Sequence, residues 1–377
     1  MMKRKILLIM LGLLGIIILR REIVFAQNTQ GSFEKRLNDV DFTPMDTVIR
    51  NYGTGMNINM RDIFLKAVAG ELDLSPQVLI NTFLRLFFSE IYDNAGLLRN
   101  LLILGIVSAM LKNLTDSFAN KAVGETGFYI CYISMFIMVF SSFRIAAGIL
   151  VDFANAITML IESGVPLFVS LVAMSGNFAG GYVFSTVLFF STAFVNRLMG
   201  TVIAPGIISI AALHMVNYLM EADILTYLAD LLKSLISLGL KMLAIGIVSI
   251  ISLQKISTPL LNNIVMKTAK STVNAVPIVG DILVGAVESV VYWTKAIRGG
   301  VLVAVIIAVA AICLMPLIKL AALALTFKIS AALIQPVCDK RIVECINAAG
   351  VYTGLFLSAG AIMVFMFMAC IIIMLSF

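Results

Sequence analysis

The chain has 377 residues, of which 61% are hydrophobic and 13% charged, and its mean hydropathy is +1.05. Soluble domains are about 45–50% apolar and about 25% charged, so this composition excludes a soluble globular protein and indicates a polytopic membrane protein. The net charge of +6 does not indicate nucleic-acid binding, because most of the excess positive charge lies in the first 26 residues. Long continuous apolar runs favour helices over a barrel of short alternating strands, which predicts an all-α fold.

Residues 1–26 have the pattern of a cleavable signal peptide. A basic start at Lys3–Lys5 precedes an apolar stretch of 14 residues, Ile6–Leu19, which is short for a membrane span. Val24-Phe25-Ala26 places small residues where signal peptidase cuts, so we expect cleavage after Ala26. The pair Arg20-Arg21 resembles a stop-transfer flank and leaves a retained anchor as the alternative.

Residues 27–95 form the one substantial polar region, predicted to be a short extracytoplasmic or interfacial helical segment. Ser75 is a good N-cap, and Pro76 suits the first position of a helix. Apolar residues then recur at a spacing of four: Leu79, Phe83, Phe87 and Ile91. Such a broad apolar face suits a helix that lies on the membrane surface or packs on a bundle.

The apolar runs lie in two regions on either side of the stretch 254–300. These are a transmembrane region at 96–253 and a C-terminal transmembrane region at 301–377. We predict about seven or eight spans, some of them broken or re-entrant, among the segments 97–112, 127–150, 156–175, 178–196, 201–220, 235–253, 301–325 and 351–375. The positive-inside rule does not settle the side on which 254–300 lies. Either one segment among 156–220 or the stretch 326–350 is therefore a candidate re-entrant segment.

Several runs contain candidate helix breaks, at Gly164, Pro166, Pro205, Gly206 and Pro316. Proline removes a backbone donor and kinks a helix, and broken helices often mark a transporter's substrate site. An ordinary kink relieved by a neighbouring helix is the simpler interpretation.

Catalytic chemistry has little support in this sequence. The candidate intramembrane ionisable residues are Arg144, Asp152, Glu162, His214 and Lys319, and His214 is the single histidine of the chain. We interpret it as a packed or hydrogen-bonded residue rather than a proton-relay member. The five cysteines have no metal-ligand spacing, and no hydrolase, protease or nucleotide motif is present. We expect no enzyme activity, no catalytic residues, no metal and no cofactor.

The amphipathic stretch 254–300 carries a stripe of charge at Asp281, Glu288 and Lys295. A spacing of seven places these three residues on one helical face. The simpler interpretation is a helix at the membrane interface with its charges in water. The sharper hypothesis is that this face lines a polar passage or docks a partner subunit.

The second half of the chain resembles the stage III sporulation protein AE family. The similarity is carried by "KTAK" at 267–270, "PIVG" at 277–280 and "AALIQPVCDKRIVE" at 331–344, and it extends over nearly the whole chain. Where the family pattern has a glycine-rich turn after Gln-Pro, this chain has Val337-Cys338-Asp339.

The resemblance implies a role that the residues alone do not indicate. It implies a multi-pass protein of the mother-cell membrane around the forespore, belonging to a secretion-like channel complex. The implied partners are the other subunits of that complex and the lipid bilayer, with homo-oligomerisation left open. The alternatives are an autonomous secondary transporter with a site near Pro166 and Pro205, and an intramembrane enzyme built around His214.

Overall fold

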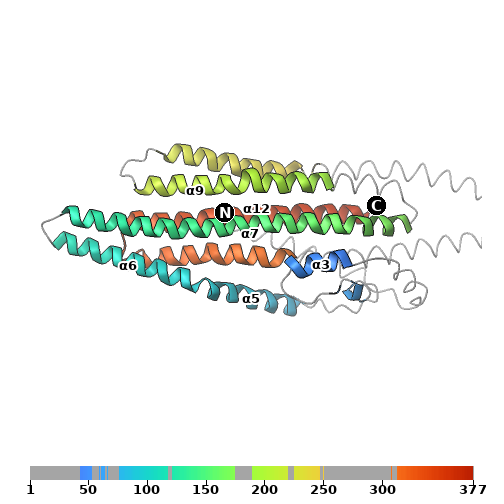
Figure 1. Cartoon of the computed structure of the whole chain (residues 1–377), viewed down its shortest axis with the longest axis horizontal. Helices are drawn as coiled ribbons and strands as arrows, with labels where there is room; N and C mark the ends of the chain where they lie inside the picture. The colour runs from blue at the N-terminus through green and yellow to red at the C-terminus, as the bar shows by residue number, and fades with distance from the viewer. Residues whose placement is uncertain are drawn as a thin grey trace, which may run out of the picture.

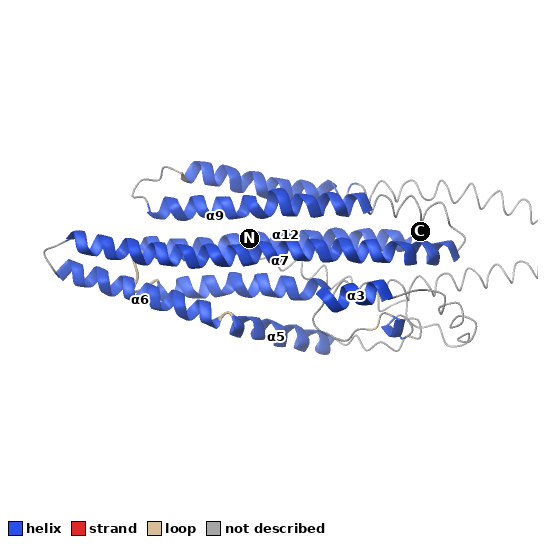
Figure 2. Cartoon of the chain, viewed as in Figure 1, coloured by secondary structure: helices blue, strands red, loops and turns tan. Residues whose placement is uncertain are grey.

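The structure is a computed structural model, and apart from a few single positions it describes residues 43–52, 76–117, 121–174, 189–219, 225–246 and 312–376. Every regular element in these residues is a helix (Figure 2). The main elements are α3 (Thr43–Tyr52), α5 (Pro76–Asp93), α6 (Ala95–Ser117), α7 (Lys121–Met174), the π-helical turn η2 (Met199–Ile203), α9 (Ala204–Leu219) and α12 (Lys340–Ser376). Residues 189–198, 226–246 and 312–334 are also helical.

Among the described residues, the long helices form a bundle of three antiparallel pairs (Figure 1). The pairs are α6 with α7, 189–219 with 226–246, and 312–334 with α12. In Figure 1 the connected ends of all three pairs lie at the left of the bundle, and we call this the turn end. Two contacts between pairs confirm that these ends lie together. Lys112 near the end of α6 bonds Asp339, and Tyr132 near the start of α7 bonds the Met215 carbonyl.

Five helices of the described residues are long and apolar enough to cross a membrane: Ala95–Asn113, Glu125–Ser163, Phe189–Leu219, Ile312–Ile334 and Lys340–Met368. The all-helical membrane character is therefore confirmed, whereas the expected count of seven or eight spans is not. Two of the expected divisions, at Asp152 and at Arg197, fall within helices that continue past them. A charged side chain leaves the backbone hydrogen bonds of a helix intact, so a charge alone does not mark the end of a span.

The helix α7 shows this most clearly. Its 54 residues join the two spans expected at 127–150 and 156–175, and the helix continues past Gly164 and Pro166 to Met174. At about 1.5 Å per residue it is about 81 Å long, well beyond the hydrocarbon core of a bilayer at about 30 Å. A substantial part of α7 therefore lies beyond the thickness of one membrane.

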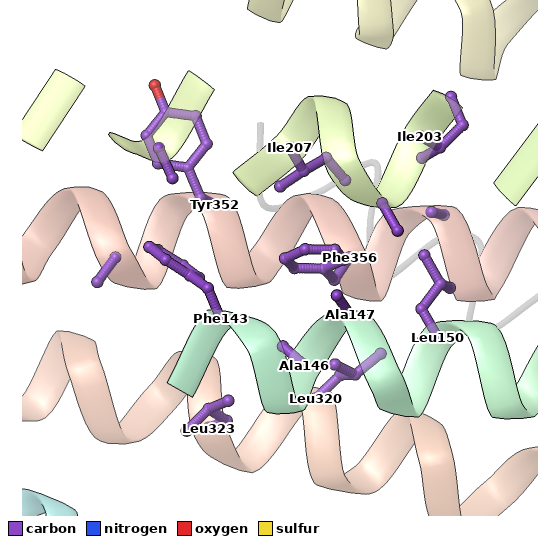
Figure 3. Packing of buried hydrophobic residues seen from close by; sticks show 14 of the residues in the cluster. Phe143, Ala146, Ala147, Leu150, Ile203, Ile207, Leu320, Leu323, Tyr352 and Phe356 are labelled. Carbon is purple, nitrogen blue, oxygen red and sulfur yellow. The ribbon is translucent and has the colours of Figure 1, made fainter. Parts of the chain in front are cut away.

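The core lies where α7, α9, α12 and the helix 312–334 meet (Figure 3). Phe143 and Leu150 of α7 and Phe356 of α12 are fully buried, and Ile207 of α9 packs into the same cluster. Because lipid is as apolar as leucine, close packing rather than burial from water holds such helices together. Buried hydroxyl groups bond one turn back along their own helix, as in Thr326 to Ala322 O at 2.9 Å and Thr353 to Ala349 O at 2.9 Å.

The helix that contains α9 passes through Pro205 by widening one turn. Proline has no N–H, and its ring presses on the carbonyl four residues earlier, here that of Thr201. In response, Met199–Ile203 form a π-helical turn, and the Ala204 N–H bonds the Met199 carbonyl five residues back. The Thr201 hydroxyl donates to Arg197 O at 2.6 Å, one turn back along the helix.

Two glycines allow helices to approach closely. A Cβ added at Gly206 would lie 2.5 Å from Cδ1 of Ile236 in the helix 226–246. A Cβ added at Gly350 of α12 would lie 2.8 Å from Cγ of Lys328 and 3.2 Å from the carbonyl oxygen of Ala324. Small residues at such crossings are typical of membrane helix pairs.

The polar N-terminal region contributes α3 and α5. The short helix α3 packs on α7 through the buried side chains of Val48 and Ile49. The helix α5 begins at Pro76, as the sequence predicted, and Asn94 joins it directly to α6. Its exposed large apolar residues are Ile80, Phe83, Leu84, Phe88 and Tyr92. The predicted signal peptide lies outside the described residues.

Candidate functional site: polar side chains at the turn end

Asp339 organises the connection between 312–334 and α12. Its Oδ1 accepts a hydrogen bond from the Arg341 N–H at 2.9 Å, which makes Asp339 the N-cap of α12. Its Oδ2 accepts a hydrogen bond from Lys112 Nζ at 2.7 Å, which ties α6 to this turn. The Arg341 guanidinium adds a contact through Nε at 3.3 Å. Two cationic side chains and one backbone N–H therefore meet one carboxylate.

These contacts set the charge state of Asp339. Partial burial by itself raises the pKa of a carboxyl group, but the hydrogen bonds from Lys112 and Arg341 outweigh it, so the pKa of Asp339 lies below its usual value. The neighbouring Cys338 thiol has a raised pKa because it is partly buried and lies beside the Asp339 charge. A thiol that stays protonated is a poor nucleophile.

Arg341 extends this cluster to α7. Its guanidinium carbon lies 4.1 Å from the centre of the Phe128 ring, a cation–π contact. The Asp339 turn, which we define as Lys112, Phe128, Asp339 and Arg341, thus joins α6, α7 and α12 at their turn ends.

His214 is the centre of a second cluster between α9, 226–246 and α12. Its side chain is about nine-tenths buried, and Nε2 lies 3.6 Å from Oδ1 of Asp230. That distance is too long for a hydrogen bond, and the buried Nε2 has no hydrogen-bond partner within the described residues. Its ring packs between Tyr218 at 6.1 Å and Tyr352 at 5.6 Å, measured between ring centres.

A cation borders the same cluster. Lys233 Nζ lies 5.8 Å from the centre of the Tyr352 ring, one turn along the helix from Asp230. We call His214, Asp230, Lys233, Tyr218 and Tyr352 the His214 cluster. Asp230 is 59% exposed, so the cluster has one open and one buried side.

The connection beside the His214 cluster is held by Asn217. Its side-chain N–H donates to Thr226 Oγ1 at 2.7 Å, and its Oδ1 accepts from the Leu225 N–H at 2.9 Å. This buried amide spans the connection from α9 to the helix 226–246 and fixes where that helix begins.

The two clusters can bind charge or protons, but their geometry does not assemble a reaction centre. No group of three or more metal-ligating side chains occurs in the part of the chain that the structure describes. The His214–Asp230 pair resembles two members of a triad, yet the separation of 3.6 Å is not a formed hydrogen bond. The expectation that the protein is not an enzyme stays a prediction.

None of the predicted site residues that the structure describes belongs to either cluster. Asp281, Glu288 and Lys295 fall outside the described residues, so the polar-face hypothesis stays a prediction. Gly164 and Pro166 lie within α7, and Pro316 lies within the helix 312–334. Pro205 and Gly206 belong to the first turn of α9, directly after the π-helical turn. Whether any of these positions lines a substrate path also stays a prediction.

The sequence interpretation named His214 but missed its neighbours. Asp230 and Tyr352 are remote from it in the chain, and no local pattern announces a contact between different helices. Asp339 could have been found, because an Asp placed after Gln335-Pro336 and before a long apolar run is an N-cap signal. Its partner Lys112 lies 227 residues away and carries no such signal.

Comparison with known proteins identifies two similarities. A family model described as Stage III sporulation protein AE matches residues 58–377. The chain is 26% identical to the Stage III sporulation protein AE of Bacillus subtilis (strain 168) over 324 residues, covering 85% of this chain and 80% of that protein. No solved structure matches the chain.

Proposed function

We propose that this chain, which belongs to the stage III sporulation protein AE family, is the membrane-embedded subunit of a sporulation-specific channel or secretion-like complex. That complex would link the mother cell and the forespore, and this subunit would sit in the mother-cell membrane around the forespore. Family membership carries the sporulation role. The five apolar helices support a position in the membrane.

The fold suits a subunit of an assembly better than a self-contained catalyst. Its helices are joined by close glycine contacts and by the capped Asp339 turn, which favours a stable framework. α7 is too long for one bilayer, so it offers surface beyond the membrane to other proteins. We therefore propose that the partners of this chain are the other subunits of the stage III complex.

The test is genetic and biochemical. Deleting the gene in its endospore-forming host should reduce heat-resistant spores by several orders of magnitude, and the intact gene should restore them. A fluorescent fusion should encircle the forespore, and cross-linking during sporulation should capture other sporulation subunits. Normal spore counts in the deletion strain would contradict the proposal.

One observation supports a second candidate, an autonomous secondary transporter. The π-helical turn before Pro205 is a local irregularity of the kind found near binding sites. In that case the purified protein alone should move a solute into liposomes. Absence of flux with all candidate solutes, together with captured sporulation partners, favours the subunit.

A further inference from the structure

The outward face of α7 changes character along its length. From Thr126 to Ser141 its exposed side chains carry no charge, and they include Ile130, Ile133, Ile137 and Phe140. Arg144 is the next exposed position, and Asp152 and Glu162 follow beyond it. Ile145 and Met159 are exposed in that second part as well, so the change is from uniformly uncharged to mixed.

Other helices change at a comparable place. When each is followed from the turn end, a basic residue comes after a stretch without charge. These residues are Arg99 in α6, Arg144 in α7, Arg197 in 189–219, Lys241 in 226–246 and Lys319 in 312–334. Four of the five are exposed, and Lys319 is half-buried. At about 1.5 Å per residue they lie about 23–35 Å from the helix termini at the turn end.

Contacts between helices locate two of these residues relative to α7. Asn196, next to Arg197, bonds Asn155 of α7 at 3.1 Å. Gly360 of α12 faces both Leu317, two residues before Lys319, and Phe153 of α7. The two contacts align the neighbourhoods of Arg197 and Lys319 with the part of α7 that follows Arg144.

The turn end provides the other limit. The described charged side chains of its half, among them Lys112, Asp230, Lys233 and Lys328, lie within about 11 Å of the helix termini. A lysine at that depth can extend its ammonium to the surface, and the stem of Lys328 lies across Gly350. Between this level and the basic residues, no described residue of the bundle carries a carboxylate, ammonium or guanidinium group.

We propose that Arg99, Arg144, Arg197, Lys241 and Lys319 form a basic girdle that binds the phosphates of lipid headgroups. The bilayer encloses the bundle between this girdle and the turn end. The five basic residues lie about 23–35 Å from the helix termini at the turn end, a range that includes the hydrocarbon thickness of about 30 Å. A guanidinium group can donate two parallel hydrogen bonds to two oxygens of one phosphate, and a lysine ammonium binds phosphate as a point charge.

The proposal places the rest of α7 in water. The carboxylates of Asp152 and Glu162 then project from a stem outside the lipid, where the polar helix α3 packs on α7. This inference rests on the membrane embedding that the proposed function requires, but it does not depend on a role in sporulation.

Single spin labels on the full-length protein in liposomes test the boundary. With the five native cysteines replaced, a label at Ile133 should collide with oxygen and be shielded from a water-soluble nickel chelate. Labels at Asp152 and Glu162 should show the reverse. The proposal is wrong if Glu162 is as lipid-exposed as Ile133. It is also wrong if Ile133 is accessible to neither reagent, because protein would then cover that face.

Solid-state NMR distances between arginine guanidinium carbons and lipid phosphorus test the girdle itself. We expect dephasing of the arginine signal in liposomes of mixed anionic and zwitterionic lipid, lost in the triple variant R99Q/R144Q/R197Q. The matched control R85Q changes an exposed arginine of α5 outside the girdle and should keep the signal. An unchanged signal in the triple variant contradicts the girdle. If sporulation is normal in the deletion strain but both measurements agree, the girdle stands without the proposed function.

Discussion

Two helix connections at the turn end differ in how their polar groups are bonded. The first joins 312–334 to α12, and the second joins α9 to 226–246. In the first, Asp339 accepts from the Arg341 N–H and from Lys112, so its carboxylate is fully engaged. Beside the second, within α9, the buried His214 Nε2 is without a hydrogen bond within the described residues and faces Asp230 across 3.6 Å. The first arrangement stabilises one geometry. The second leaves the cost of an unsatisfied buried atom in place.

The contrast separates stability from latent function. A buried polar group that is fully hydrogen-bonded stabilises the fold. A buried polar group without a partner lowers the stability, and it remains able to bind a proton or a partner. We therefore expect the Asp339 side of the bundle to be sensitive to substitution and the His214 side to tolerate it.

The largest effect should come from filling the close contact between α12 and the helix 312–334. Gly350→Leu places a side chain where Lys328 and the Ala324 carbonyl already lie, and the backbone oxygen cannot move aside. We expect a loss of about 2–3 kcal/mol, measured by thermal unfolding in detergent. The matched control is Gly354→Leu, one turn along, where nothing lies within 4 Å. Equal losses in both variants would show that the contact is not tight.

Removing the cap should come next. Asp339→Ala loses the N-cap of α12 and the bond to Lys112, about 2 kcal/mol in total. Asp339→Asn retains a good capping side chain and loses only the charge, so about half of that loss should remain. If Asn and Ala are equally destabilising, the capping role assigned to Asp339 is wrong.

Acid should reproduce the loss of charge. Because the folded-state pKa of Asp339 is depressed, its stabilising contribution is present above the pKa of the unfolded state, near 3.8, and falls as pH drops through the folded value. The melting temperature should therefore decrease below about pH 4 more in the native protein than in Asp339→Asn. Parallel pH profiles for the two proteins would exclude this contribution.

The smallest effect is expected on the other side of the comparison. His214→Leu replaces the unsatisfied buried nitrogen by an apolar group of similar size, so stability should change by less than about 1 kcal/mol, in either direction. The Tyr218 and Tyr352 rings remain as packing partners. A loss as large as that of Asp339→Ala would mean that His214 makes a bond that strongly stabilises the fold.

The sequence predicted what depends on composition and local pattern. Hydropathy identified an all-helical membrane protein, and Pro76 marked the start of α5. The expected number of spans is not confirmed, and α7 continues through the division expected at Asp152. The site was mostly missed because Lys112–Asp339 and His214–Asp230 join residues from different helices. Such pairs depend on how helices pack, which no window of local sequence contains.

The π-helical turn at Met199–Ile203 has a consequence for the part of its helix that precedes it. Each residue in an α-helix advances the side-chain direction by about 100°, so one extra residue in a turn rotates everything before it by that angle. Asn196 meets Asn155, and Arg197 points outward, only in the rotated setting. Deleting one residue of this turn would shorten the chain by less than 0.3% yet turn ten residues to another face. Pro205, which imposes the turn, thus determines which way the side chains of residues 189–198 face.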